Sequence, residues 1–245
     1  MIIAVANQKG GVGKTTTAQA LAAGLAGKGY KVLGIDLDPQ GNFSSACGVE
    51  SYNVPTVYEV MKRTATIQEA MQHAKGGYDL VPANIMLAGA EQELSQTGKE
   101  HRLKEAVAPV AGDYDFIVID TPPSLGVLTV NAFTCATDIL IPTTAGTGSE
   151  ATMNSIVAVP EKQLKVGIVN PEMIPDYVIL DGSLLKNLPR KIAAATGVDA
   201  MAHAVECFTS NKANPFSNLF AKAAAKLIFD NIEAACDDPE AEEAK

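Results

Sequence analysis

The sequence is poor in several residue types that mark specialised proteins. Its 245 residues contain no tryptophan, 5% aromatic side chains and three histidines. The four cysteines lie far apart, and no two of them form a C-x-x-C pair: Cys47, Cys135, Cys207 and Cys236. This spacing suggests neither a zinc ribbon nor a disulfide framework. Buried or idle thiols in a reducing compartment explain this spacing best.

Long apolar runs are missing as well. No stretch approaches the roughly 18–20 consecutive apolar residues of a membrane span, and the first residues contain no basic region or cleavage site. We therefore expect a cytoplasmic protein that does not contact the membrane. Contents of 47% hydrophobic and 19% charged residues are ordinary for a soluble globular protein with a sizeable core.

The sequence also lacks an excess of basic residues. It has 19 Lys and Arg residues against 28 Asp and Glu residues, which gives a formal net charge of −9, and both halves are acidic. Nucleic-acid binding depends on clustered lysine and arginine side chains that neutralise phosphates. We therefore expect DNA binding to be weak or absent.

The most informative segment is Lys-Gly-Gly-Val-Gly-Lys-Thr-Thr at residues 9–16. It follows an apolar stretch at residues 2–6, which we expect to be a strand, and it precedes an alanine- and leucine-rich stretch at about residues 15–26, which we expect to be a helix. A glycine-rich loop in this context is a phosphate-binding loop. The predicted nucleotide contacts are Gly10, Gly11, Val12, Gly13, Lys14, Thr15 and Thr16.

The chemistry of this loop favours a nucleoside triphosphate with Mg²⁺. Its glycines let backbone N–H groups close around phosphate oxygens. The Lys14 ammonium can reach the β- and γ-phosphates, and the Thr15 hydroxyl is placed to bind Mg²⁺.

The rest of the first part reads as alternating strands and helices, with strands predicted at residues 2–6, 32–36, 78–81, 116–120 and 138–141. This pattern predicts an α/β fold, a P-loop parallel sheet flanked by helices. Ligands of such sheets bind at the carboxyl ends of the strands. Asp36 and Asp38 end the second predicted strand and Asp120 ends the fourth, although Asp36 could equally serve only to form a turn.

Three motifs in order resemble the ParA/MinD family of P-loop ATPases, most closely the ParA-type partition ATPases: the lysine-first loop, D-x-D-P-Q-G-N at residues 36–42 and D-T-P-P at residues 120–123. The resemblance covers residues 1–142. It implies that Lys14 holds the β- and γ-phosphates of ATP and that Thr15 binds Mg²⁺. Asp120 would support the metal through water, and Asp38 would orient the attacking water.

The same resemblance implies partners. Lys9 would be the lysine that reaches across an ATP-dependent homodimer to the partner's phosphates. A ParB-like activator and a role in plasmid or chromosome partitioning would follow. The basic C-terminal region that contacts DNA in this family is not recognisable, and neither are its adenine-binding residues.

After Pro142 the sequence resembles a different family, the iron-containing alcohol dehydrogenases, at residues 142–150 and 197–206 and on to about Cys236. The resemblance implies Asp199 and His203 as two metal ligands, with NAD and Fe²⁺ as cofactors. Four residues apart on a helix, they can share one face. The family has two further ligand histidines, but the other histidines here, His73 and His101, lie in the first part. We therefore expect a vestigial iron or zinc pair.

The expected organisation is a ParA-like P-loop ATPase portion at residues 1–142, a dehydrogenase-like fragment at residues 143–236 and an acidic mobile tail at residues 237–245. The fragment should be mostly helical. We predict strands at residues 165–169 and 175–180, then helices over residues 183–235 with breaks near Gly197 and around residues 211–215.

Three hypotheses follow for the function. The first is a ParA-type ATPase that binds Mg·ATP and hydrolyses it slowly. The second is an NAD-dependent iron-type alcohol dehydrogenase, which is disfavoured because two metal ligands and the dinucleotide loop are missing. The third is a non-catalytic mosaic of the two families.

Overall fold

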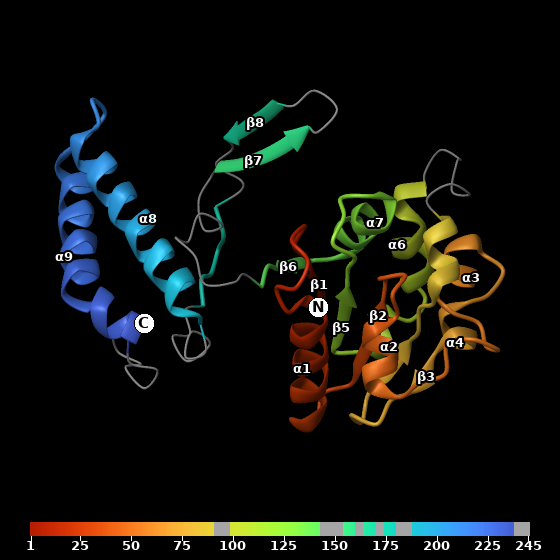
Figure 1. Ribbon diagram of the computed structural model, residues 1–245. Helices are drawn as coiled ribbons and strands as arrows, with labels where there is room; N and C mark the ends of the chain where they lie inside the picture. The colour runs from red at the N-terminus through yellow and green to blue at the C-terminus, as the bar shows by residue number, and fades with distance from the viewer. Residues whose placement is uncertain (91–98, 143–153, 160–163, 170–173, 180–187, 238–245) are drawn as a thin grey trace. The chain divides into compact units, whose positions relative to one another are not determined.

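The computed structural model describes residues 1–90, 99–142, 154–159, 164–169, 174–179 and 188–237 (Figure 1). The chain divides into two compact units, Met1–Thr143 and Thr144–Lys245. The first unit contains the phosphate loop, and the second contains the segment that resembles a dehydrogenase.

The first unit is built on one six-stranded sheet with the order β3-β4-β2-β5-β1-β6. Its strands are β1 (Ile2–Val5), β2 (Val32–Asp36), β3 (Gln72–His73), β4 (Asp79–Val81), β5 (Phe116–Asp120) and β6 (Asp138–Leu140). All neighbours are parallel except β3, which pairs antiparallel with β4 at one edge. The predicted α/β class and its five strands are confirmed, whereas β3 was not predicted.

Helices bury both faces of this sheet: α1 (Lys14–Gly27), α2 (Asn42–Cys47), α3 (Val57–Lys62), α4 (Ile67–Ala70), α6 (Arg102–Val107) and α7 (Val127–Cys135). Short 3₁₀ helices connect them: η1 (Ile85–Gly89), η2 (Lys99–His101) and η3 (Ala111–Asp113). Successive side chains of a strand alternate between faces. In β5, Ile117 therefore packs in the cluster with α3, α6 and α7, and Val118 packs in the cluster with α1 and α2.

The strand register brings the acidic residues together. Asp120 on β5 pairs with Asp36 on β2 and with Val5 on β1. Since β1 leads directly into the phosphate loop, these two carboxylates lie at the carboxyl ends of strands beside the loop. The sheet thus supplies the arrangement that the strand-end rule predicts.

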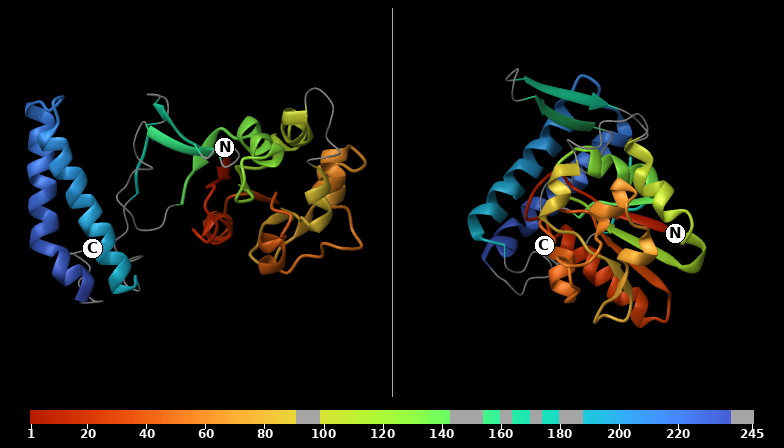
Figure 2. Two further views of the ribbon diagram at one scale, coloured as in Figure 1. Left: turned by 45° about the horizontal axis from the view of Figure 1, so that its top comes forward. Right: turned by 90° about the vertical axis from the view of Figure 1, so that its right-hand side faces the viewer.

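The second unit contains two antiparallel pairs. Strands β7 (Asn154–Val159) and β8 (Leu164–Val169) form a two-stranded sheet, and helices α8 (Arg190–Thr209) and α9 (Pro215–Asp237) pack along each other. Figure 2 shows the two helices (blue) side by side. The mostly helical C-terminal part and the strand at residues 165–169 are confirmed, whereas β7 was not predicted. No helix in the described ranges is long and apolar enough to cross a membrane.

Two local predictions for this unit are wrong. Residues 175–179 form no strand, and Pro175 has no N–H to donate to a neighbouring strand. Helix α8 runs through Gly197 without a break. A Cβ at Gly197 would lie 2.8 Å from Ile232 Cδ1, so this glycine permits close packing of α8 on α9. The predicted break at residues 211–215 is confirmed, since α8 ends at Thr209 and α9 begins at Pro215.

Gly34 in β2 provides a test of the sheet packing. A Cβ at this buried position would lie 2.6 Å from Leu80 Cδ1 and 3.0 Å from Phe43 Cζ. We expect Gly34→Ala to lower the free energy of unfolding by about 1–3 kcal/mol, because the core must shift to admit the methyl group. Urea unfolding of the parent and the variant measures this difference.

Gly24→Ala is the matched control. Gly24 is exposed within α1, and no atom lies within 4 Å of a Cβ built there. Alanine at this position should be neutral or stabilise the protein by up to about 1 kcal/mol, because it favours the helix. Equal losses of stability in the two variants would contradict the packing effect assigned to Gly34.

Candidate nucleotide-binding site

The phosphate loop connects β1 to the first turn of α1. Gly11 and Gly13 have φ values of +73° and +83°, a left-handed conformation that side chains rarely tolerate. Helix α1 begins at Lys14 and has no side-chain cap, so its first backbone N–H groups remain available at the positive end of the helix dipole. The loop is therefore shaped to bind an anion.

Lys14 lies inside this loop rather than on its surface. Its side chain is 7% exposed, and its ammonium donates a hydrogen bond to the Lys9 backbone oxygen at 3.2 Å. An ammonium has three N–H donors. This hydrogen bond holds the buried ammonium inside the loop. Its other two N–H groups could donate hydrogen bonds to phosphate oxygens. The Lys9 side chain lies at the exposed start of the same loop.

Thr15 and Asp120 form the best candidate for a metal site. The Thr15 hydroxyl donates to Asp120 Oδ2 at 2.7 Å, while Asp120 Oδ1 is buried and has no hydrogen-bond partner among the described residues. A hydroxyl beside an unpaired buried carboxylate oxygen suits Mg²⁺, which prefers oxygen ligands and keeps several waters. The residues present therefore fit this ion.

The environment of Asp120 disfavours its charged form. Burial raises its pKa to about 7, and the negative charges of Asp36 and Asp38 act in the same direction. The Thr15 hydrogen bond and the Lys14 charge oppose this rise. A nearby divalent cation would favour the ionised carboxylate.

Asp36 organises the segment that follows β2. Its Oδ1 accepts the Asp38 backbone N–H at 3.1 Å, and its Oδ2 accepts the N–H and the hydroxyl of Ser44 at 2.8 and 2.7 Å. Burial raises the pKa of Asp36 to about 6, although the bonds from Ser44 oppose this effect. Asp38 itself is 7% exposed, and its Oδ1 accepts the Gln40 N–H at 2.9 Å.

Asn7 is a positioning residue that the sequence interpretation missed. Its Oδ1 accepts the Lys9 backbone N–H at 2.9 Å, and its Nδ2 donates to the Pro142 carbonyl oxygen at 3.0 Å. The side chain thus fastens the start of the phosphate loop to the chain that leaves β6. An asparagine that bonds to the backbone two residues later is a known turn former, so the local contact was recognisable from sequence, whereas the contact to Pro142 was not.

The second pair of predicted ligands lies elsewhere. Asp199 and His203 are both on α8, with 3.7 Å between Asp199 Oδ2 and His203 Nε2, and their side chains are 60% and 63% exposed. In the part of the chain that the structure describes, no three or more His, Cys, Asp or Glu side chains are grouped so as to hold a metal ion. The two side chains therefore form an exposed pair on one helix surface.

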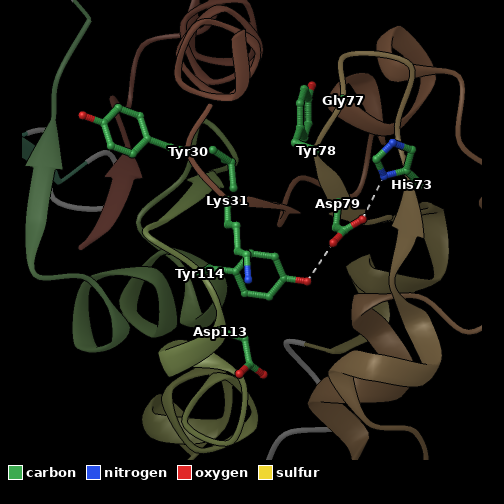
Figure 3. Close-up of a pocket in the computed structure, with 9 residues that line it drawn as sticks. Tyr30, Lys31, His73, Gly77, Tyr78, Asp79, Asp113 and Tyr114 are labelled. Atoms are coloured by element: carbon green, nitrogen blue, oxygen red, sulfur yellow. Dashed lines mark hydrogen bonds and ion pairs between the residues drawn. The ribbon is translucent and has the colours of Figure 1, made fainter. Parts of the chain in front are cut away.

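A separate cavity lies at the amino ends of β2 and β4, whereas the phosphate loop follows the carboxyl end of β1. It has a volume of about 420 Å³ and is lined by Tyr30, Lys31, Val32, His73, Gly77, Tyr78, Asp79, Asp113 and Tyr114. Figure 3 shows Asp79 between two partners: His73 Nδ1 at 3.1 Å and the Tyr114 hydroxyl at 2.8 Å. These contacts join β3, β4 and the segment before β5, and they were not predicted from the sequence.

Comparisons with known families assign the two parts of the chain differently. Residues 1–169 match the family model described as "AAA domain", and residues 193–245 match the model described as "Fe-containing alcohol dehydrogenase family, C-terminal". These matches confirm that the chain resembles two families. The first match continues past Pro142, where the resemblance seen in the sequence ended, and includes β7 and β8.

Two curated relatives each match a little over half of the chain. Over 144 residues the chain is 49% identical to the chromosome partitioning protein ParA of Myxococcus xanthus, covering 58% of this chain and 51% of that protein. Over 144 residues it is 48% identical to the sporulation initiation inhibitor protein Soj of Bacillus subtilis, covering 58% and 57%. The chain thus spans about half the length of these curated relatives.

A solved structure gives a similar match. It is a crystal structure of cobyrinic acid a,c-diamide synthase from Mycobacterium smegmatis with a bound ATP analogue and magnesium. The identity is 46%, the TM-score is 0.56, and the match covers 58% of this chain and 59% of that one. The similarity of the chain to known proteins therefore extends from sequence to structure over 58% of its length.

The raised pKa of Asp120 predicts how stability depends on pH. Its pKa in the folded protein, about 7, lies above the ordinary value of 3.8, so its contribution to stability is present at low pH and is lost as pH rises from about 4 to about 7. Asp36 acts in the same direction, with a pKa of about 6. Without nucleotide and metal, we expect Asp120→Asn to be more stable than the parent at pH 8, by on the order of 1–3 kcal/mol.

Urea unfolding between pH 4 and pH 8 measures this effect, and the difference should shrink towards pH 4. Asp113→Asn, which changes an exposed carboxylate, should leave the pH profile of the parent unchanged. Parallel profiles for Asp120→Asn and the parent would show that burial of Asp120 does not govern this pH dependence.

Proposed function

Because the chain belongs through residues 1–169 to the family described as "AAA domain", we propose that its first unit is a ParA-type P-loop ATPase portion that binds Mg·ATP and hydrolyses it slowly. The observation that carries this proposal is the buried Lys14 ammonium in a glycine-rich loop beside the Thr15–Asp120 pair. A phosphate-binding loop, a metal-binding hydroxyl and a supporting carboxylate are then present within one site.

The chain's own groups account for phosphate binding. The backbone N–H groups of residues 10–16 and the Lys14 ammonium would surround the β- and γ-phosphates, where phosphoryl transfer spreads negative charge. Thr15 would bind Mg²⁺ directly, and Asp120 would hold it through water. When bound, Mg²⁺ neutralises charge on the β- and γ-oxygens.

Asp38 is the proposed residue for orienting the attacking water. The bond from its backbone N–H to Asp36, and the bonds from Ser44 to Asp36, would fix the loop that carries it. Asp36 would therefore act through Asp38 rather than on the water. Lys9 would serve hydrolysis in an ATP-dependent homodimer, since its exposed side chain starts the loop.

The biological context is proposed from the relatives. The name of the Myxococcus xanthus relative, chromosome partitioning protein ParA, supports a role in partitioning. A ParB-like activator as partner rests on the family resemblance of the three motifs alone. The net charge of −9 argues for weak or absent DNA binding by this chain. We assign residues 1–142, which contain the three ATPase motifs, to the ATPase portion. We assign residues 143–236 to the dehydrogenase-like fragment, although residues 143–169 also fall in the "AAA domain" match, and residues 237–245 to an acidic tail.

An NAD-dependent iron-type dehydrogenase is not proposed. The family match at residues 193–245 supports the ancestry of the fragment, but Asp199 and His203 supply at most two ligands and are exposed to solvent. Two donors from one helix surface bind a divalent metal far more weakly than a complete ligand set. A non-catalytic role for this fragment is consistent with that chemistry.

Substitutions in the loop test the proposal. Lys14→Ala removes the cation that surrounds the β- and γ-phosphates, so ATP binding measured by titration calorimetry with Mg²⁺ should be abolished. Asp38→Ala is the matched control, because it leaves the loop intact and should bind ATP while turnover falls at least tenfold. Lys9→Ala should also bind ATP but lose dimer-dependent hydrolysis. If Lys14→Ala bound ATP as tightly as the parent, the proposed site would be wrong.

Thermal unfolding with added ligands separates the two families. A ligand that binds the folded site raises the melting temperature. We expect Mg·ATP to do so, whereas NADH, Fe²⁺ and Zn²⁺ should not, and elemental analysis should find no stoichiometric iron or zinc in the purified protein. One tightly held metal per chain that is lost in His203→Ala would contradict this assignment of the second unit.

A further inference from the structure

Helix α9 carries an apolar stripe on its surface. Phe216, Leu219, Phe220 and Leu227 are 77%, 64%, 70% and 64% exposed. Together with Ala223 they form what we call the α9 stripe. The spacing 216, 220, 223 and 227 alternates steps of four and three residues, which places these side chains on one helix face in the pattern of a helix–helix seam.

The α9 stripe lies on the face of α9 that is turned away from α8. The opposite face contains Ala221, which is buried, and Ile232, which packs at the Gly197 position of α8. Figure 1 shows α8 and α9 running side by side. Helix α9 therefore has two apolar faces, and α8 covers only one of them.

The size of the stripe is that of an interface. With about 150–250 Å² for each aromatic side chain, the four large side chains expose roughly 500 Å². Two copies would together bury roughly 1,000 Å², which reaches the lower limit for a specific protein–protein interface. A patch of this size is also at the upper end of what monomeric proteins expose.

The arrangement of the stripe fits a second copy of the same helix. Leu219 and Leu227 lie four residues before and after Ala223, so an antiparallel pair of α9 helices crossing at Ala223 places each leucine opposite the other. The small Ala223 side chain permits close approach at the crossing. No residue of the stripe is charged, and Lys226 nearby is paired with Asp230 at 2.6 Å, so like charges do not oppose each other.

We propose that two copies of the chain associate through the α9 stripe, with their α8–α9 hairpins forming an antiparallel four-helix arrangement. Such an interface is isologous, because the same surface is used by both copies. It does not involve the nucleotide site. Association should therefore occur without ATP and persist in Lys14→Ala.

Sedimentation equilibrium of the full chain, without nucleotide and between about 1 and 100 μM, tests this proposal. The parent should form a concentration-dependent dimer. Phe220→Glu should weaken the dimer at least tenfold, because each copy then places one negative charge in the apolar interface. The substitution leaves the face that packs on α8 untouched, so far-ultraviolet circular dichroism should be unchanged, and Leu227→Glu provides a second variant with the same expectation.

Phe229→Glu is the matched control. Phe229 is on the same helix and 77% exposed, but it lies two residues beyond Leu227 and therefore about half a helical turn away from the stripe. The change in charge and apolar area is the same as in Phe220→Glu, yet the dimer should keep its affinity. A parent that stays monomeric at all concentrations, or equal weakening by Phe229→Glu and Phe220→Glu, would overturn the proposal.

Discussion

The parallel pairing of β5 with β1 is the constraint on which the candidate site depends. It places Asp120 beside Val5, at the point where β1 leads into the phosphate loop, and so allows the hydrogen bond between Thr15 and Asp120. The Thr121 hydroxyl reinforces this register by donating to the Val5 carbonyl oxygen at 2.9 Å. A slip of one residue would turn Asp120 to the other face of the sheet and separate it from Thr15.

The same register imposes an electrostatic cost. Asp36 and Asp120 are paired on adjacent strands and both are fully buried, with Asp38 close by. Burial raises the pKa of both paired carboxylates. An apolar pair would stabilise the sheet better at neutral pH, so the two carboxylates are consistent with the proposed role in ligand binding rather than with a role in folding. The Ser44 and Thr15 hydroxyls reduce the cost, and a bound divalent cation would offset the rest.

Features set by local sequence were predictable, and features set by distant contacts were not. The loop at residues 9–16, the first turn of α1 and the five predicted strands of the first unit follow from composition and spacing within short windows. Strand β3 depends on β4 as its partner, and the bond from Asn7 to Pro142 joins residues 135 positions apart. At Gly197 a distant contact overrides a local signal. Glycine weakens an isolated helix, which is why a break was predicted, but here it allows α9 to pack closely on α8.

The second unit shows why family similarity and chemistry can differ. Residues 193–245 match the dehydrogenase family model, and in this chain they form most of α8 and all of α9, with Gly197 at the contact and a break between the helices. A metal site depends on ligands that converge from distant parts of a chain. Asp199 and His203 come from one helix and remain exposed, so the fragment has kept its helix packing and not its ligand set. The α9 stripe is also explained by packing. Helix α9 has two apolar faces, and α8 covers one of them.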